Sequence, residues 1–188
     1  ASALFDNWED WEDDRFQRNM WVQTGEVLNR ESFGRYRQIG GGVITFSRTE
    51  EQTRTALRNP LTMVASDGRI LNGRGHPRSS GTYAKVLGQY VQEEQIISLM
   101  DALRRMTIEP ARRLEKFVPA MRNKGRIRVG ADADITIFDP EKIRDRATYA
   151  DPILPSQGIE YVLVNGAVVL DEKNLNPEIH AGIAIRSN

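Results

Sequence analysis

Residues 43–68 read VITFSRTEEQTRTALRNPLTMVASDG and predict two strands joined by one helix. Residues 43–46 are apolar and mostly β-branched, as in a strand. Thr49 and Gln52 have the spacing of a capping box, in which two side chains bond free backbone groups at a helix start, and Asn59-Pro60 ends that helix. Residues 61–65 form a continuous apolar run, which is typical of a strand covered on both faces. The stretch therefore indicates an α/β fold with parallel strands.

The residues before this stretch are less regular. Residues 1–28 mix acidic and aromatic side chains without a period of two or 3.6, which predicts an irregular segment. Its tryptophans are expected to pack against neighbours, and a lid over an active site is the alternative. Phe33 and Tyr36 fit a short helix that ends at the glycines 40–42, where a left-handed residue can close the last turn.

Three more helices are predicted after residue 65, the first of them behind a glycine-rich loop. The apolar residues of that helix recur with a 3.6-residue period and are Tyr83, Val86, Leu87, Tyr90 and Val91. Ser98 and Asp101 have the spacing of a cap for the next helix. Thr107 with Pro110 opens one more helical turn, which runs through Leu114.

From about residue 120 the pattern changes to short β-branched runs separated by turn residues. Residues 125–130, 133–139 and 159–164 predict strands, and Asn165-Gly166 is a hairpin signal that leads into residues 167–170. We therefore predict two domains. Residues 1–120 form the α/β part, and residues 121–188 form a small β unit.

The composition limits the kind of partner that the chain can bind. Lys and Arg number 26, Asp and Glu number 26, and the pI is about 7.0, so no net field draws the chain to nucleic acid or an anionic membrane. No apolar run approaches the roughly 20 residues that span a bilayer. The chain has 0 Cys, which rules out a disulfide framework and a thiolate metal cage. With no sign of a signal peptide, we expect a cytoplasmic protein.

Asp67 is the first candidate for chemistry. It follows directly on the apolar run 61–65, and reactive groups in parallel α/β folds stand at the C-terminal ends of strands. A carboxylate at that position can bind a divalent cation or accept a proton from water. The alternative is that Asp67-Gly68 only forms a turn. His76 and Arg78 lie in the same loop, although a lone His or Arg is usually a hydrogen-bonded or solvated loop residue.

Four segments in this order resemble the C-terminal third of the D-aminoacylase (N-acyl-D-amino-acid deacylase) family of the amidohydrolase superfamily. The segments are MVASDGRILNGRGHPRSSGTYAKVLGQYVQEE from residue 63, ISLMDALRRMTIEPARRLE from 97, NKGRIRVGADADITIFDPEKIRDRATYADP from 123, and GIEYVLVNGAVV from 158. The Gly-Ala-Asp-Ala-Asp run at 130–134 identifies only the superfamily, whereas HPRSSGT after SDG narrows the resemblance to this family.

The resemblance implies a (β/α)8 TIM-type barrel with a small β-sandwich. Residues 1–120 would be the C-terminal part of the barrel, with residues 43–46 as its seventh strand and 61–65 as its eighth, and residues 121–188 would be part of the sandwich. Asp67 would bind metal and act as general base, and Arg78 would bind the substrate carboxylate, with His76 beside it. The implied activity is zinc-dependent hydrolysis of a linear amide bond in N-acyl-D-amino acids.

The chain departs from the family in its metal ligands. The family has a His-x-His pair on its first strand, whereas the histidines of this chain are His76 and His180, of which His180 lies in the tail. A catalytic zinc usually has three protein ligands, so Asp67 alone cannot hold one. We therefore expect zinc only in the full-length protein, and expect this chain alone to be inactive.

Two further hypotheses remain open. The chain could be a non-catalytic fragment or subunit that completes a barrel with another polypeptide, because half a barrel exposes strand edges that must be covered. It could also be a relative of cyclic amidases such as dihydropyrimidinase. In either case we expect a small-molecule substrate for the complete protein, and association of this chain with the rest of the barrel or with itself.

Overall fold

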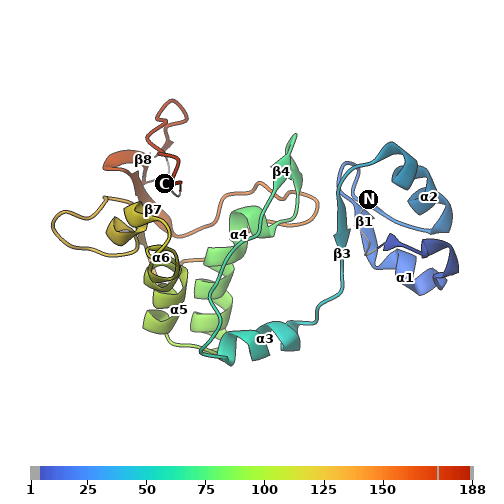
Figure 1. Ribbon diagram of the computed structural model, residues 1–188, viewed down its shortest axis with the longest axis horizontal. Coiled ribbons are helices and arrows are strands. Elements are labelled where there is room, and N and C mark those ends of the chain that lie inside the picture. Colours follow the sequence, from blue (N-terminus) through green and yellow to red (C-terminus); the bar gives the residue numbers. More distant parts are fainter. Residues whose placement is uncertain (1–4, 173, 187–188) are drawn as a thin grey trace. The chain divides into compact units, whose positions relative to one another are not determined.

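The computed structural model describes residues 5–172 and 174–186, which form two compact units (Figure 1). Each unit is assembled from segments that are distant in the sequence. The first combines the described residues up to 53 with 67–80 and 147–154, and the second combines 54–66, 81–146 and 155 onward. The predicted domain boundary near residue 120 stays a prediction.

Most elements are short. The helices are η2 (Trp8–Asp10), α1 (Asp13–Gln17), α2 (Arg30–Ile39), α3 (Glu50–Arg58), α4 (Arg78–Lys85), the π-helix η3 (Val86–Glu93), α5 (Leu99–Met106), α6 (Ile108–Leu114) and η4 (Pro119–Asn123). The strands are β1 (Asn19–Trp21), β2 (Glu26–Val27), β3 (Val43–Thr45), β4 (Ile70–Leu71), β5 (Arg74–Gly75), β6 (Ile135–Phe138), β7 (Ile159–Val164), β8 (Ala167–Asp171) and β9 (Asn174–Leu175). No helix of the described residues combines the length and apolar character needed to span a membrane.

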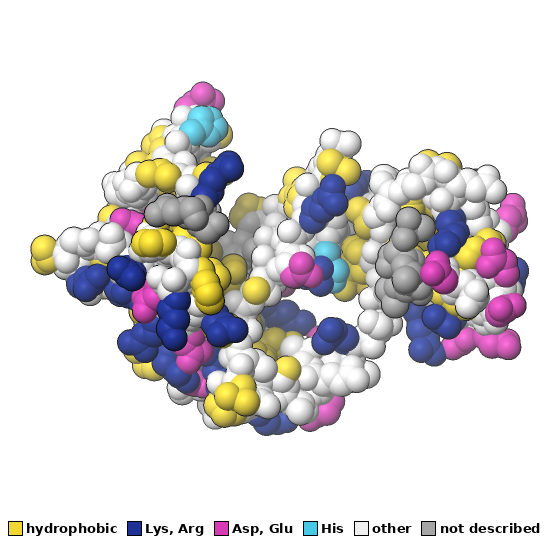
Figure 2. Space-filling model, viewed as in Figure 1, with side chains coloured by type: hydrophobic (Ala, Val, Ile, Leu, Met, Phe, Trp, Pro, Cys, Tyr) yellow, Lys and Arg dark blue, Asp and Glu magenta, His cyan; other side chains and the backbone are white. Residues whose placement is uncertain are grey.

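The N-terminal segment is ordered, so the prediction of an irregular segment over residues 1–28 was wrong for its described part. It holds α1, β1 and β2, and its aromatic side chains pack around Phe16, which is fully buried. Trp11, Trp21 and Phe33 belong to the same cluster. The prediction that the tryptophans pack against neighbouring side chains is therefore confirmed. Figure 2 shows acidic side chains gathered over the part of the chain that carries α1. A core made of aromatic rings from several short elements leaves no periodic pattern, which is why the sequence did not reveal it.

Helix α2 and strand β3 confirm two predictions. Helix α2 ends at Gly40, whose φ of 76° only glycine adopts easily. Strand β3 pairs with β1 in the antiparallel register Met20↔Ile44, and the sheet order is β2-β1-β3. The parallel pairing predicted for this strand is therefore not found among the described residues.

The capping box of α3 is confirmed. The Thr49 backbone N–H donates to Oε1 of Gln52 at 2.9 Å, and the Gln52 N–H donates to Oγ1 of Thr49 at 3.2 Å. Helix α3 ends at Arg58, as Asn59-Pro60 predicted. The caps are local, so they follow directly from sequence spacing.

Two predicted strands are wrong in the described structure. Residues 61–65 and 125–130 form no strand, and the side chains of Leu61 and Ile127 are 89% and 90% exposed. In the first segment, the Val64 N–H donates instead to the carbonyl of Arg105 at 3.2 Å. A strand needs a neighbouring strand to satisfy its backbone groups, and neither segment has one among the described residues.

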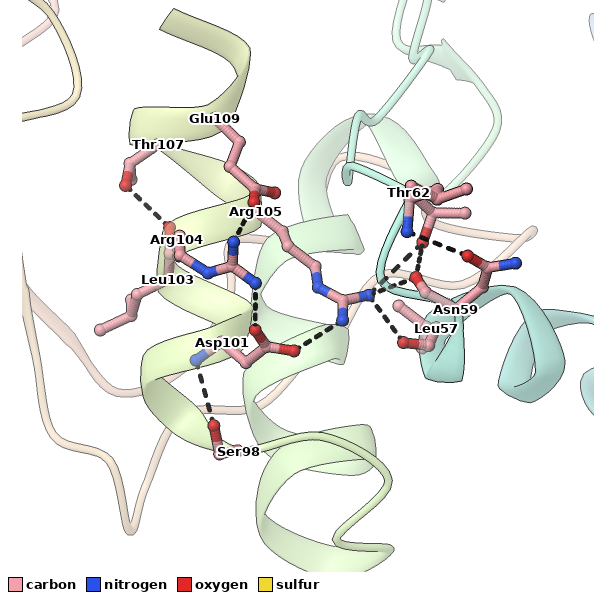
Figure 3. Close-up of polar contacts among 11 residues, drawn as sticks. Leu57, Asn59, Thr62, Ser98, Asp101, Leu103, Arg104, Arg105, Thr107 and Glu109 are labelled. Carbon is pink, nitrogen blue, oxygen red and sulfur yellow. Dashed lines mark hydrogen bonds and ion pairs between the residues drawn. The ribbon is translucent and has the colours of Figure 1, made fainter. Parts of the chain in front are cut away.

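Arg105 of α5 anchors the chain that leaves α3 (Figure 3). Its side chain is 3% exposed, and Nη1 donates to the carbonyls of Leu57 and Asn59 at 2.8 and 2.9 Å. Nη2 donates to Oδ2 of Asp101 at 2.6 Å, which balances the buried charge. Helix α5 itself begins at Ser98, whose side chain accepts the Asp101 N–H as predicted. One guanidinium therefore joins α5 to the C-terminus of α3.

The core of the second unit lies around helices α4, η3 and α5. Its fully buried members include Ala102 of α5, Tyr90 of η3 and Ile143 from the segment after β6. Gly88 of η3 lies against that segment, since a Cβ atom there would be 2.4 Å from the Ile143 carbonyl oxygen. Close approach at this point thus requires glycine.

The C-terminal sheet is an antiparallel meander in the order β6-β7-β8-β9. Asn165 and Gly166, with φ of 49° and 83°, join β7 to β8 in the predicted hairpin. Asp134 of the Gly-Ala-Asp-Ala-Asp run accepts the Asn165 N–H at 2.7 Å and pairs with Lys124, which holds the pKa of Asp134 below its usual value. This superfamily motif therefore stabilises the sheet.

Candidate functional site

Asp67 and Arg78 close a loop in the first unit. Nη2 of Arg78 lies 2.7 Å from Oδ2 of Asp67, although the Asp67 side chain is 86% exposed. Asp67 has a φ of 46°, in the left-handed region that Asp tolerates better than most residues. Gly68 follows, and a Cβ atom on it would lie 2.5 Å from Cα of Ser79. Asp67 thus lies in the left-handed region of the backbone and carries a paired carboxylate, while residues 67–68 form no regular turn.

A hairpin lies inside this loop, where the sequence predicted only a glycine-rich loop. Strands β4 and β5 are joined by Asn72 and Gly73, with φ of 51° and 74°. These two positive φ values are those of the turn that Asn-Gly favours in hairpins. The same dipeptide signal predicted the hairpin at Asn165-Gly166, so this hairpin was open to prediction as well.

His76 is held from two sides. Its Nδ1 accepts the backbone N–H of Arg78 at 3.0 Å, and its Nε2 lies 3.4 Å from the hydroxyl of Tyr149. The two rings meet edge to face with centroids 5.2 Å apart, and Phe46 packs on Tyr149 in the same way at 5.0 Å. Because Nδ1 accepts, a neutral His76 ring carries its proton on Nε2, toward Tyr149.

Tyr149 was not identified from the sequence, because no local pattern links it to His76, 73 residues earlier. Burial raises the pKa of its hydroxyl, and the nearby charge of Arg78 opposes that rise. The Tyr149 hydroxyl therefore stays protonated at neutral pH and can donate a hydrogen bond beside His76.

The three predicted site residues line one cavity of about 800 Å³. The cavity wall also includes the residues of β3, and Arg69 and Arg74 from in and beside the hairpin. Both arginines were missed, because their common face becomes visible only once Asn72-Gly73 is taken as a turn. Asp67, His76 and Arg78 thus come together, whereas His180 is an exposed residue of the second unit.

The described residues do not fit a zinc site by themselves. Nowhere in residues 5–172 and 174–186 do three or more His, Cys, Asp or Glu side chains gather as metal ligands would. Oδ2 of Asp67 is engaged by Arg78. A catalytic zinc usually has three protein ligands, so the described residues alone offer fewer than such a site needs.

The chain is similar to amidohydrolases. The profile of the amidohydrolase family matches residues 14–170. An N-acyl-D-glutamate deacylase of Alcaligenes xylosoxydans xylosoxydans is 40% identical over 131 residues, which are 70% of this chain and 26% of that protein. The crystal structure of a D-aminoacylase has a TM-score of 0.72 at 29% identity, over 91% of this chain and 39% of the other.

A second solved relative was determined with ligands. The N-acyl-D-glutamate deacylase of Bordetella bronchiseptica, complexed with zinc and a phosphonate inhibitor that mimics the tetrahedral intermediate, has a TM-score of 0.67 at 31% identity. That match covers 86% of this chain and 36% of the other. The chain spans 26–28% of the length of the curated relatives that it matches.

Proposed function

Because the chain belongs to the amidohydrolase family, of D-aminoacylase type, we propose that the full-length protein hydrolyses the amide bond of N-acyl-D-amino acids. The resemblance predicted from four sequence segments is thereby confirmed at the level of the family. The observation that carries the activity is the meeting of Asp67, His76 and Arg78 on one cavity.

In this proposal Asp67 moves the proton. It takes a proton from the attacking water and returns it to the leaving amine, which is the role that the family resemblance implies. A single carboxylate can do both when it lies within hydrogen-bond reach of the two atoms in turn. The position of Asp67 on the cavity supports this role. Any zinc would be held mostly by residues of the full-length protein that this chain does not contain.

Arg78 binds the substrate carboxylate in the same proposal. A guanidinium offers a planar fork of donors that matches a carboxylate in a bidentate pair. Arg78 already pairs with one carboxylate, that of Asp67, at 2.7 Å. An incoming α-carboxylate would compete for this fork and release Asp67 for proton transfer. His76 fixes the backbone of Arg78 through its Nδ1.

We also propose the architecture of the complete protein from the resemblance. Residues 1–120 belong to the C-terminal part of a (β/α)8 barrel, and residues 121–188 to a β-sandwich. The fold match to part of a D-aminoacylase supports this assignment. Residues 61–65 would then become a strand once neighbouring barrel strands supply hydrogen-bond partners.

The test is turnover of N-acetyl-D-amino acids by the full-length protein with zinc, compared with Asp67→Asn. General acid–base catalysis contributes about 10²- to 10⁴-fold, so kcat should fall by that range. Asp10→Asn is the matched control, because Asp10 is exposed and lies outside the cavity. Undiminished turnover by the Asp67 variant would reject its role. Preferential hydrolysis of hydantoins would instead favour a cyclic amidase.

A second role, completion of a barrel with another polypeptide, is favoured by the exposure of large apolar side chains. Leu61, Ile127 and Val129, which lie in the two segments that formed no strand, are the most exposed of them. Apolar side chains gathered at predicted strand positions favour burial against a partner.

A further inference from the structure

We propose that Tyr149 is a positioning residue of the site: its ring holds the His76 imidazole, and His76 in turn holds the backbone of Arg78. The proposal rests on the proposed deacylase function, in which Arg78 binds the substrate carboxylate. Tyr149 is not among the residues that line the cavity, so it acts through His76 and not by touching the substrate.

The contact between Tyr149 and His76 carries the first step. The two rings meet edge to face with centroids 5.2 Å and planes 69° apart, and the Tyr149 hydroxyl lies 3.4 Å from Nε2 of His76. Aromatic pairs favour this arrangement, because the positive edge of one ring lies against the negative face of the other. The hydrogen bond is long, so ring packing makes the larger contribution. The ring of Tyr149 therefore restricts rotation of the imidazole.

The orientation of the imidazole decides what His76 can bond. Its Nδ1 accepts the backbone N–H of Arg78 at 3.0 Å, and Nη2 of Arg78 donates to Oδ2 of Asp67 at 2.7 Å. A rotated ring would take Nδ1 away from that N–H, because the two ring nitrogens lie at different places on the ring. The backbone at Arg78, from which the guanidinium extends, would then lose its hydrogen bond.

Tyr149 is itself held from two directions. Phe46 packs against its ring edge to face, with centroids 5.0 Å apart. The chain around Tyr149 is closed by two hydrogen bonds of 3.0 Å between Thr148 and Asp151, and the side chain of Pro152 is fully buried. A ring that is held in this way can restrict its neighbour, whereas a mobile side chain could not.

The experiment measures deacylation of N-acetyl-D-amino acids by the full-length protein with zinc. Tyr149→Leu removes the ring, so KM should rise about 3- to 10-fold, the range expected for an aromatic pair, while kcat stays within about 2-fold, because Arg78 binds substrate and transition state alike. Tyr149→Phe keeps the ring and should leave KM within about 2-fold of the wild type. Tyr161→Leu is the matched control, because the Tyr161 hydroxyl also has a bonded partner, Glu172 at 3.1 Å, but lies outside the cavity wall.

A double substitution shows whether Tyr149 acts through His76. In a His76→Ala background, Tyr149→Leu should raise KM no further, because the ring that Tyr149 positions is gone. Independent substitutions would instead multiply their effects on KM, and that result would overturn the proposal. Phe46→Leu removes the packing behind Tyr149 and should also raise KM, so it decides the question if Tyr149→Leu does not fold.

Hydrogen–deuterium exchange gives a reading that does not depend on turnover. The Arg78 amide should exchange faster in Tyr149→Leu and His76→Ala, and at the wild-type rate in Tyr149→Phe. Turnover in which Tyr149→Leu leaves KM unchanged, or lowers kcat in place of raising KM, overturns the positioning role and leaves the deacylase intact. The expected exchange pattern without any turnover upholds the positioning role and rejects the proposed function. Absence of both overturns the two together.

Discussion

Gly88 is a residue at which two backbone segments meet without a side chain between them. Its neighbour is the carbonyl oxygen of Ile143, itself fully within the core of the second unit. Sequence reasoning gave this glycine no role, because it lies within a helical pattern where glycine is usually only unfavourable. Its packing partner is 55 residues away and has no local signature.

Gly88→Ala should therefore destabilise the protein. The added Cβ would meet backbone, which cannot move aside as a flexible side chain can, and overpacking of this kind costs about 1–3 kcal/mol. Gly182→Ala is the control, because that position has open space, and it should change stability by less than about 0.5 kcal/mol. Urea denaturation measures both. Equal midpoints for the two variants would show that η3 can shift away from residue 143.

The site residues show the same difference between local sequence signals and contacts that form only on folding. Asp67, His76 and Arg78 were selected from one loop of the sequence and line one cavity, although the strand that was expected to present Asp67 does not form. The contacts of Tyr149 with His76 and of Arg74 with Ala150 were not predictable, since they join chain segments that meet only after folding. Local spacing thus identified the loop, and tertiary contacts supply the rest of the cavity.

At the scale of elements, the second-unit portion of helix α3 is held by an ion pair at one end and by hydrogen bonds to its carbonyls at the other. Arg54 binds Glu94 with two hydrogen bonds, of 2.7 and 3.1 Å, and Arg105 binds the carbonyls at its C-terminus. Helix ends were predictable because caps are local. The strands predicted at residues 61–65 and 125–130 were wrong, because a strand depends on partners that sequence spacing cannot supply.

Arg105→Met should destabilise the second unit by about 2–4 kcal/mol, because it leaves two inward carbonyls without their donor. Arg104→Met is the control next to it. Arg104 is 46% exposed, and its pairs with Asp101 and Glu109 are screened by water, so the loss should be clearly smaller. Thermal unfolding of both variants gives the comparison. A larger loss at Arg104 would contradict the anchoring role of Arg105.

The Arg54–Glu94 pair predicts a pH dependence. Hydrogen bonds from Arg54, and then from Gln89, lower the pKa of Glu94 from 4.5 to about 2. A carboxyl with a lowered pKa stabilises the folded state above its unfolded pKa, and that stabilisation is lost as the pH falls through its folded value. Stability should therefore decline between about pH 4.5 and about 2.

Urea midpoints across that pH range test this dependence. Glu94→Gln should show a shallower decline than the wild type, because the titrating group is gone. Glu178→Gln, which replaces an exposed carboxylate near the C-terminus, should follow the wild-type curve. Parallel curves for the wild type and Glu94→Gln would exclude Glu94 as the source of the acid sensitivity.

At the scale of the whole molecule, the exposed apolar side chains predict association. Leu61 and Ile127 are almost fully accessible in the chain alone, at positions where the sequence pattern expects buried strands. Light scattering after size exclusion should find the isolated chain larger than a monomer of 21.3 kDa. Leu61→Ser with Ile127→Ser should shift it toward the monomer. A monomer at all concentrations for the unmodified chain would refute this expectation.

Residues 147–154 belong to the first unit although they lie far along the sequence from its other segments. The Ser80 hydroxyl donates to the carbonyl of Pro152 at 2.9 Å, and the Tyr149 hydroxyl contacts His76. During synthesis the His76 side of the cavity lacks its tyrosine until residue 149 has left the ribosome. Contacts of such long range also slow folding. This side of the cavity is therefore expected to form late, after the local elements around it.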